Sequence, residues 1–275
     1  MRMTAVPADG HHERMEEDFD LLESAVREAG ALALSYFGRE VVSKQKADGT
    51  RVSEADLAVD ALLQERLLAA RPGYGWLSEE TADDLRRLDC PLVWILDPID
   101  GTHAFLAGTP EWTIAAALVE NGRPVLSVVL NPATKEMYTA RAGSGAFLNG
   151  APIEVVDRAE IAGAAVIANT GLFTRKIWPE PWPEMSLSWV NSVAYRLARI
   201  AHGKVNATVS TTPKSEWDLA APTLLVQEAG GIVTEIDGKV PLFNQPVPRH
   251  NGLVAAGRNL HRLLLERTRA VAGSN

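Results

Sequence analysis

The sequence predicts a molecule that joins an α+β half to an α/β half. Two helical stretches come first and are followed by strands joined by tight turns, which is typical of a sheet covered by helices. Beyond about residue 151 helices and strands alternate, which is typical of an α/β layer. The length of 275 residues is enough for one large domain or two modest ones with a sizeable core.

Two helices are expected near the start of the chain. In the first, over residues 16–38, apolar residues recur at three- and four-residue steps until a glycine ends the pattern. A polar turn over residues 44–51 follows. The second helix begins after Ser53, which has the spacing of a capping box with Asp56, and it stops before Pro72.

Strands then dominate the rest of the N-terminal half, which we place at residues 16–150. Asn121 and Gly122 fit a tight hairpin turn between two of these strands. The expected strands cover residues 75–78, 92–96, 112–119, 124–130, 135–140 and 145–148. Strands linked by hairpins predict a largely antiparallel sheet.

The C-terminal half, residues 151–275, alternates between the two kinds of element. The expected strands cover residues 164–168, 205–210, 232–236 and 253–256, and the expected helices cover residues 190–201, 219–229 and 260–271. A loop over residues 177–184 is rich in Trp and Pro. These residues favour rigid contact over mobility, so we expect this loop to pack or to form an interface.

Composition excludes several classes of partner. The 35 acidic and 27 basic residues give a net charge of −8, which argues against a nucleic-acid polymer or an anionic membrane as partner. No apolar run reaches the roughly 18 residues of a membrane span. Residues 1–15 are polar, lack the apolar core of a signal peptide and are expected to form a flexible leader. A lone cysteine, Cys90, suits a reducing, cytoplasmic environment.

The most informative segment begins where an apolar run leads directly into Asp97 and Asp100. Two carboxylates at the end of a buried strand repel each other unless a cation lies between them. The backbone N–H groups of Gly101 and Thr102, at an expected helix start, could bind an anion. The segment could instead be a plain turn. A calcium EF-hand loop fits poorly, because Ile99 occupies a position that needs an oxygen-bearing side chain.

Further carboxylates could complete a cation site. Glu79 and Glu80 end the strand over residues 75–78, Asp218 begins a helix, and Asp56 lies in the first turn of another. Asp56 and Asp218 could instead only cap their helices, and the two glutamates could form a solvated corner. Oxygen ligands without a His or Cys cluster favour Mg²⁺ or Mn²⁺ over zinc. Two such cations about 4 Å apart would serve phosphoryl transfer.

Four segments occur in an order that is specific when taken together. They are Val52-Ser53-Glu54-Ala55-Asp56, Ser78-Glu79-Glu80-Thr81, Asp97-Pro98-Ile99-Asp100-Gly101-Thr102, and Trp217-Asp218-Leu219-Ala220-Ala221 with Glu228-Ala229-Gly230-Gly231. They resemble the signatures of the inositol monophosphatase family, except that Ser78 replaces a glycine. The resemblance implies an alternating αβαβα sandwich, usually a homodimer, that hydrolyses small phosphorylated metabolites with Mg²⁺ and is inhibited by lithium.

The resemblance also implies a role for each position, with the active site in the cleft between the two halves. The implied ligands of two to three Mg²⁺ ions, for which Mn²⁺ could substitute, are Glu79, Asp97, the Ile99 carbonyl, Asp100 and Asp218. The implied catalytic residues are Asp56, Thr102 and Glu79, of which Asp56 and Thr102 would orient and deprotonate the attacking water. The residues expected to contact the substrate are Gly101, Thr102, Asp218 and Lys214. No phosphoenzyme is expected.

The substrate is indicated by the residues around the second signature. Inositol-type members carry a glutamate before the aspartate of that signature, whereas residues 210–214 here contain no carboxylate and end in Lys214. Residues 77–80 and 215–218 resemble the 3′(2′),5′-bisphosphate nucleotidase branch, and Lys214 could bind a second phosphate. Residues 108–113 are more similar to the inositol or histidinol phosphatases. His103 could line the pocket or lie at the surface.

These observations favour adenosine 3′,5′-bisphosphate as the substrate. Inositol 1-phosphate and histidinol phosphate are the alternatives. A more distant alternative is a non-catalytic, metal-stabilised binding protein that has kept the same scaffold. The intact set of acidic residues argues against that alternative, because loss of a ligand is the simplest route to an inactive relative.

Overall fold

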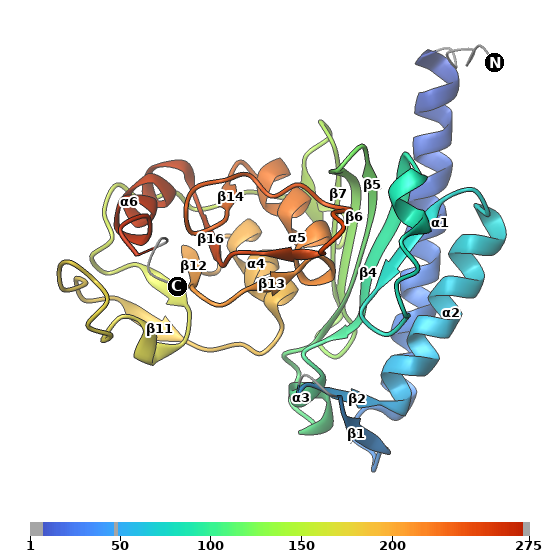
Figure 1. Cartoon of the computed structure of the whole chain (residues 1–275), viewed down its shortest axis with the longest axis horizontal. Helices are drawn as coiled ribbons and strands as arrows, with labels where there is room; N and C mark the ends of the chain where they lie inside the picture. The colour runs from blue at the N-terminus through green and yellow to red at the C-terminus, as the bar shows by residue number, and fades with distance from the viewer. Residues whose placement is uncertain (1–7, 47–48, 272–275) are drawn as a thin grey trace.

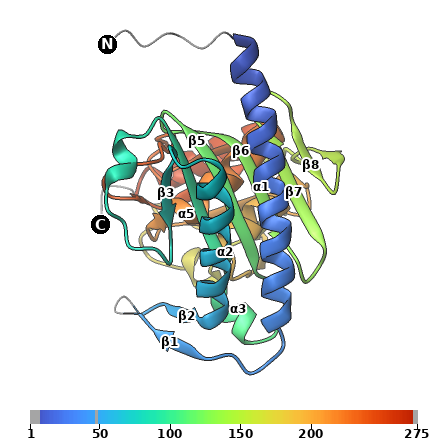
Figure 2. The same cartoon turned by 90° about the vertical axis from the view of Figure 1, so that its right-hand side faces the viewer.

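The computed structural model describes residues 8–46 and 49–271, which form five alternating layers of helix and sheet (Figure 1). Helices α1 (Ala8–Tyr36) and α2 (Glu54–Ala70) cover one face of a seven-stranded sheet, as Figure 2 shows. Helices α4 (Val193–Ala201) and α5 (Glu216–Glu228) separate this sheet from a five-stranded sheet. Helix α6 (Arg258–Thr268) covers the outer face of the second sheet. This αβαβα order confirms the predicted fold class.

The seven-stranded sheet is formed by consecutive strands in the order β3-β4-β5-β6-β7-β8-β9. Its strands are β3 (Gly75–Ser78), β4 (Leu92–Asp100), β5 (Thr113–Glu120), β6 (Arg123–Asn131), β7 (Glu136–Arg141), β8 (Ala146–Leu148) and β9 (Ala151–Ile153). Strands β3 and β4 are parallel, and the other neighbouring pairs are antiparallel. Because β9 belongs to this sheet, the N-terminal half extends beyond the predicted boundary at residue 150.

The five-stranded sheet has the order β11-β10-β12-β16-β14. Its strands are β10 (Ala165–Ile167), β11 (Ser186–Ser188), β12 (Ala207–Ser210), β14 (Ile232–Thr234) and β16 (Leu253–Ala256). Strand β10 is parallel to β11 and β12, whereas β16 is antiparallel to β12 and β14. Strand β11 lies outside the strands predicted from the sequence.

Two strand pairs and one short helix lie outside the two large sheets. Strands β1 (Ser43–Gln45) and β2 (Arg51–Ser53) form an antiparallel hairpin where the sequence predicted a turn. Strands β13 (Lys214–Ser215) and β15 (Arg249–His250) form a second antiparallel pair. Helix α3 (Thr102–Leu106) follows β4 directly. Residues 47–48, within the predicted turn, lie outside the described residues.

The core explains why β4 reads as a continuous apolar run. Trp94 and Leu96 pack in the cluster that contains α1 and α2, whereas Val93 and Ile95 pack against α4 and α5. Successive side chains of a strand point to opposite faces, so a strand covered by helices on both faces must be apolar at every position. The same alternation decides which side chains beyond Leu96 face the central helical layer.

The N-terminus differs from prediction. Residues 8–15, which were expected to belong to a flexible leader, form the first turns of α1, and residues 1–7 lie outside the described residues. The polar side chains concealed this extension, because only an occasional residue such as Met15 packs against the core.

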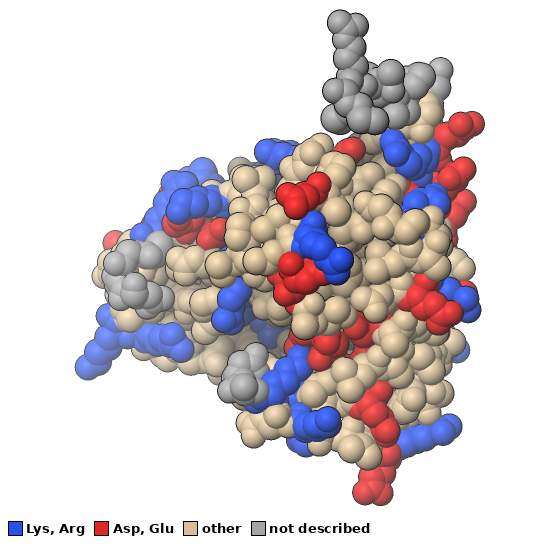
Figure 3. All heavy atoms as spheres, turned by 45° about the vertical axis from the view of Figure 1, so that its right-hand side comes forward, with Lys and Arg blue, Asp and Glu red and all other residues tan. Residues whose placement is uncertain are grey.

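Within the described part of the chain, no helix has the length and apolar character needed to cross a bilayer. The face in Figure 3 mixes acidic and basic side chains.

Helix α4 starts later than predicted, and the Trp-rich loop packs within its own half of the molecule. The helix expected from residue 190 begins at Val193, because the Ser192 hydroxyl accepts the Tyr195 N–H at 2.9 Å and caps it. In the loop over residues 177–184, the rings of Trp178 and Trp182 meet edge to face at 5.0 Å. The Trp178 indole also donates to the Leu172 carbonyl at 2.7 Å, so the loop is packed against its own half of the molecule.

Candidate active site

A bulge in β4 brings Asp97 and Asp100 to one face of the sheet. Asp97 pairs with Ala115 and Asp100 pairs with Thr113, so three steps along β4 match two steps along β5. Residues three apart in a regular strand would point to opposite faces, and the extra residue reverses this. Strand β4 therefore continues past Leu96, where it was expected to end, and both carboxylates face the central helical layer.

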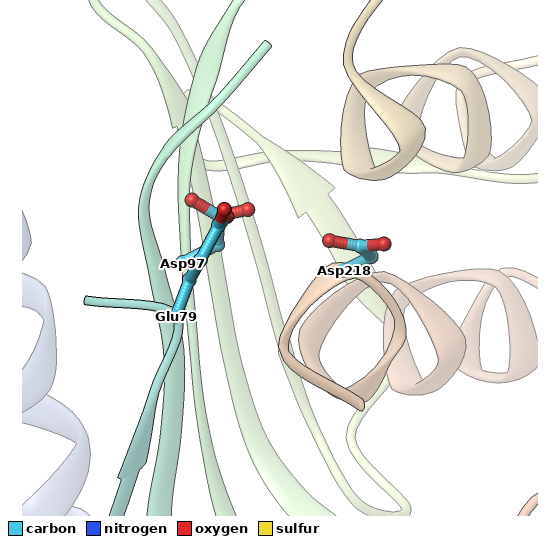
Figure 4. A group of neighbouring side chains, drawn as sticks. All are labelled: Glu79, Asp97 and Asp218. Carbon is cyan, nitrogen blue, oxygen red and sulfur yellow. The ribbon is translucent and has the colours of Figure 1, made fainter. Parts of the chain in front are cut away.

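Glu79 and Asp218 complete a compact group with Asp97. Glu79 follows Ser78, which pairs with Leu96 in the parallel ladder, so Glu79 lies beside Asp97. Asp218 approaches from the first turn of α5 on the opposite side of the gap (Figure 4). One oxygen atom from each of the three carboxylates lies within 4.8 Å of the others. Elements more than a hundred residues apart thus meet at one point.

The negative charges of this group lie close together in a buried site. Burial, together with the neighbouring Glu79, Asp100 and Asp218 carboxylates, raises the pKa of Asp97 well above its ordinary range. Burial, followed by Asp100 and Glu79, raises the pKa of Asp218 in the same way. Like charges that share a desolvated site favour a bound cation or a proton. A cluster of oxygen donors with this charge fits Mg²⁺ or Mn²⁺.

Asp100 has a structural function that its sequence position did not suggest. Its Oδ2 accepts hydrogen bonds from the Ser192 hydroxyl at 2.7 Å and the Ala194 N–H at 2.5 Å, and its Oδ1 accepts the Val193 N–H at 3.1 Å. It thus satisfies free N–H groups at the start of α4. A carboxylate has about four lone-pair sites, so one on Oδ1 is left for a cation.

Asp56 and Thr102 form the part of the site that could handle a proton. The Thr102 hydroxyl lies 3.0 Å from Asp56 Oδ1 and 3.2 Å from the Ile99 carbonyl oxygen. Asp56 also accepts the Ser53 N–H at 2.8 Å, which completes the predicted capping box of α2. The capping and functional interpretations of Asp56 are therefore compatible, because its two oxygens serve different partners.

Lys46, which was not predicted to belong to the site, contacts the acidic group. The Lys46 ammonium group lies 2.7 Å from Glu79 Oε1 and 2.9 Å from Glu80 Oε1. The glutamates raise the pKa of Lys46 despite the opposing effect of burial. Desolvation by burial raises the pKa of Glu80 to about 7, although Lys46 lowers it. Lys46 comes from the β1–β2 hairpin, so this hairpin supplies a positive charge to the site.

The carboxylates line a pocket of about 450 Å³ at the junction of the two halves. Gly101 lies in its wall with φ +98°, and a Cβ there would lie 2.9 Å from the Glu111 carbonyl oxygen, so the position favours glycine. His103 also lines the pocket, which agrees with one of its two predicted locations. The basic residues of the lining are Arg51 and Arg249.

The Lys214 ammonium group opposes the rise in the pKa of Asp218, and its expected contact with the substrate remains a prediction. This ammonium group bonds to the Thr212 hydroxyl at 2.7 Å and the Pro213 carbonyl at 3.2 Å, and Lys214 is not part of the pocket lining. Arg249 lines the pocket instead, because in the β13–β15 ribbon it pairs with Ser215 and not with Lys214. Neighbouring residues of a strand point to opposite sides, and the sequence did not reveal this pairing.

The fold and this carboxylate site define a metal-dependent phosphomonoester hydrolase. The chain belongs to the inositol monophosphatase family, which matches its residues 14–272. This result confirms the resemblance drawn from the four sequence segments and sets aside the non-catalytic alternative.

Individual relatives carry several names. The chain is 34% identical over 230 residues to an inositol-1-monophosphatase of Rhizobium meliloti, covering 80% of this chain and 85% of the relative. It is also 34% identical to a histidinol-phosphatase of Chlorobaculum parvum, covering 90% and 96%. Among solved structures, an IMPase of Thermotoga maritima superimposes with a TM-score of 0.80 at 28% identity, covering 95% of this chain and 99% of that one.

Proposed function

We propose that this enzyme hydrolyses a phosphate monoester that carries a second anionic group, with adenosine 3′,5′-bisphosphate as the representative substrate. The observation that supports this choice is the charge of the pocket lining. Its acidic residues are Glu79, Asp97, Asp100 and Asp218, which are all proposed cation ligands. The remaining charged residues, Arg51 and Arg249, would attract a second phosphate.

The proposed chemistry assigns a role to each part of the site. Glu79, Asp97, the Ile99 carbonyl, Asp100 and Asp218 would hold two to three Mg²⁺ ions, with Mn²⁺ as a substitute. When bound, such cations lower the pKa of water and neutralise phosphate charge.

The protein groups would then direct the reaction. The Thr102 hydroxyl would accept a hydrogen bond from water while donating to Asp56, so that the proton moves toward Asp56 as the water oxygen attacks phosphorus. Glu79 would help to orient this water. Gly101 and Thr102 would bind the phosphate, and Asp218 would contact the leaving alcohol, which takes up a proton from a second water molecule as its bond to phosphorus breaks.

Inositol 1-phosphate is the second candidate, and it is favoured by the names of relatives such as the Rhizobium meliloti protein. Its ring is a neutral polyol, so it would use neither arginine as an anion partner. Histidinol phosphate, suggested by the Chlorobaculum parvum relative, carries an ammonium group that Arg51 and Arg249 would repel. The order of preference is therefore bisphosphate nucleotide, inositol phosphate and histidinol phosphate.

A side-by-side assay tests the proposal. The three esters are compared at equal concentration with Mg²⁺ and with the chelator EDTA, and phosphate release is measured. The proposal requires that the nucleotide have the highest kcat/KM and that EDTA abolish turnover. A nucleotide rate far below that of either other ester would show that the substrate assignment is wrong. A homodimeric state and a cytoplasmic location remain predictions, of which light scattering in solution tests the first.

A further inference from the structure

Trp189 is an exposed aromatic residue two positions before Asn191, which lines the active-site pocket. It is 50% exposed, whereas the neighbouring Val190 is 2% exposed. The guanidinium carbon of Arg196 lies 4.1 Å from the centroid of the Trp189 ring. One face of the ring is therefore covered by a cation, and the exposed half of its surface is consistent with an open opposite face.

Arg196 makes this arrangement rigid. Its side chain is only 4% exposed, and it donates from Nε to the Val190 carbonyl at 2.7 Å and from Nη2 to the Asn191 carbonyl at 3.1 Å. The same guanidinium group thus bonds to the backbone that follows Trp189 and covers the Trp189 ring. An aromatic ring that is already fixed loses little conformational entropy when a ligand stacks on it.

The position of the ring relative to the pocket follows from the chain. Trp189 is exposed, Val190 is buried and Asn191 is half-buried. Asn191 lines the same pocket as Asp100 and Thr102. Trp189 is not itself a lining residue, but it lies two residues before Asn191 in the chain. The Arg196 guanidinium group links the two positions, because it bonds to the Asn191 carbonyl and covers the Trp189 ring.

We propose that Trp189 is the stacking platform for a flat, aromatic part of the substrate, such as the base of a nucleotide. This inference rests on the proposed function, since it assigns the base to Trp189 while Arg51 and Arg249 would bind the second phosphate. Bases stack on exposed aromatic side chains without requiring a specific hydrogen-bond pattern. An inositol ring has no aromatic face and would gain little from this residue.

Two variants of Trp189 test the inference, with Ile177→Ala as a matched control because Ile177 is also an exposed apolar residue, 45% exposed, of the same half. Trp189→Ala is expected to raise KM for adenosine 3′,5′-bisphosphate about tenfold, with little change in kcat. Its KM for inositol 1-phosphate should remain that of the parent protein. Trp189→Phe keeps an aromatic face and should restore most of the lost affinity.

Direct binding separates this inference from the proposed function. Titration calorimetry with adenosine 5′-monophosphate, the expected product, should show an affinity about tenfold weaker for Trp189→Ala than for Trp189→Phe. If the nucleotide is hydrolysed but Trp189→Ala changes neither constant, the platform is wrong and the proposed function stands. If the nucleotide is not hydrolysed, the proposed substrate is wrong, and binding that depends on Trp189 would still support the platform. Equal binding by both variants would overturn it.

Discussion

The Thr102 hydroxyl lies 3.0 Å from Asp56 Oδ1, and this contact joins the start of α3 to the start of α2. The other carboxylate oxygen of Asp56 accepts bonds from Ser53, which caps α2. One aspartate therefore serves helix stability and the proposed proton path through separate oxygen atoms. The two functions can be tested separately, because each depends on a different neighbouring side chain.

Thr102→Val should remove the proton path while keeping the shape of the side chain. We expect kcat to fall by about 10²- to 10⁴-fold, the usual contribution of general acid–base catalysis, with the melting temperature nearly unchanged. Steady-state kinetics on the ester that the enzyme turns over fastest would measure the effect. Ser53→Ala is the control, which should lose about 1 kcal/mol of stability but far less kcat. A Thr102→Val enzyme of parental kcat would contradict the assignment.

Asp97→Asn should stabilise the metal-free protein and abolish its response to Mg²⁺. Removing one charge relieves repulsion by the adjacent carboxylates, which raise the pKa of Asp97 after burial itself. We expect the melting temperature without metal to rise by about 2–4 °C, which corresponds to about 1 kcal/mol for a protein of this size. Thermal melts across a Mg²⁺ series measure both effects. The exposed Asp20, changed to Asn, should alter neither, and a fall in the metal-free melting temperature of Asp97→Asn would refute the argument.

Lys46→Met should tighten cation binding. The Lys46 ammonium group contacts Glu79, which we propose as a cation ligand, so it competes with a metal ion for the same oxygen. The loss of a partly buried pair worth about 1 kcal/mol corresponds to a Kd for Mg²⁺ that is lower by about fivefold. Titration calorimetry measures this constant. Lys44→Met, in strand β1 two residues before Lys46 and exposed, is the control, and equal or weaker Mg²⁺ binding by Lys46→Met would show that Lys46 does not compete.

His261 should make the protein less stable in mild acid. Burial lowers the pKa of His261 from 6.5 to about 4, and its Nε2 lies 3.0 Å from the Thr234 hydroxyl. The unfolded chain therefore binds a proton at a higher pH than the folded protein. The stability due to the neutral ring is complete above pH 6.5 and is lost as the pH falls toward 4.

The expected loss is on the order of 3 kcal/mol across this interval. His261→Gln cannot titrate and can keep a hydrogen bond to Thr234, so its free energy of unfolding should depend less on pH. Urea unfolding of both proteins between pH 7 and pH 4 gives the comparison, with the exposed His12→Gln as control. Identical pH profiles for His261→Gln and the parent protein would rule His261 out as the cause.

Much of the candidate site could be predicted because its residues lie in short segments with a recognisable pattern. Asp97, Asp100 and Gly101 are contiguous, and their carboxylates follow a run that is apolar at every position. Such a run predicts a strand buried on both faces, and β4 is buried along its whole length. The boundaries of α4 and α1 were less predictable, since a cap such as Ser192 and a polar first turn leave only weak periodicity.

The sequence by itself determined the chemistry of the site: oxygen ligands, a turn that favours glycine at Gly101, and a hydroxyl at Thr102. Only the tertiary structure decided which side chains meet there. The bulge turned Asp100 toward α4, the β1–β2 hairpin brought Lys46 to Glu79, and the ribbon with β13 placed Arg249 in the pocket instead of Lys214. The physical reason is that these contacts depend on strand register and on the stacking of layers. Register decides the face to which each side chain points, and a single sequence does not specify the partner strand.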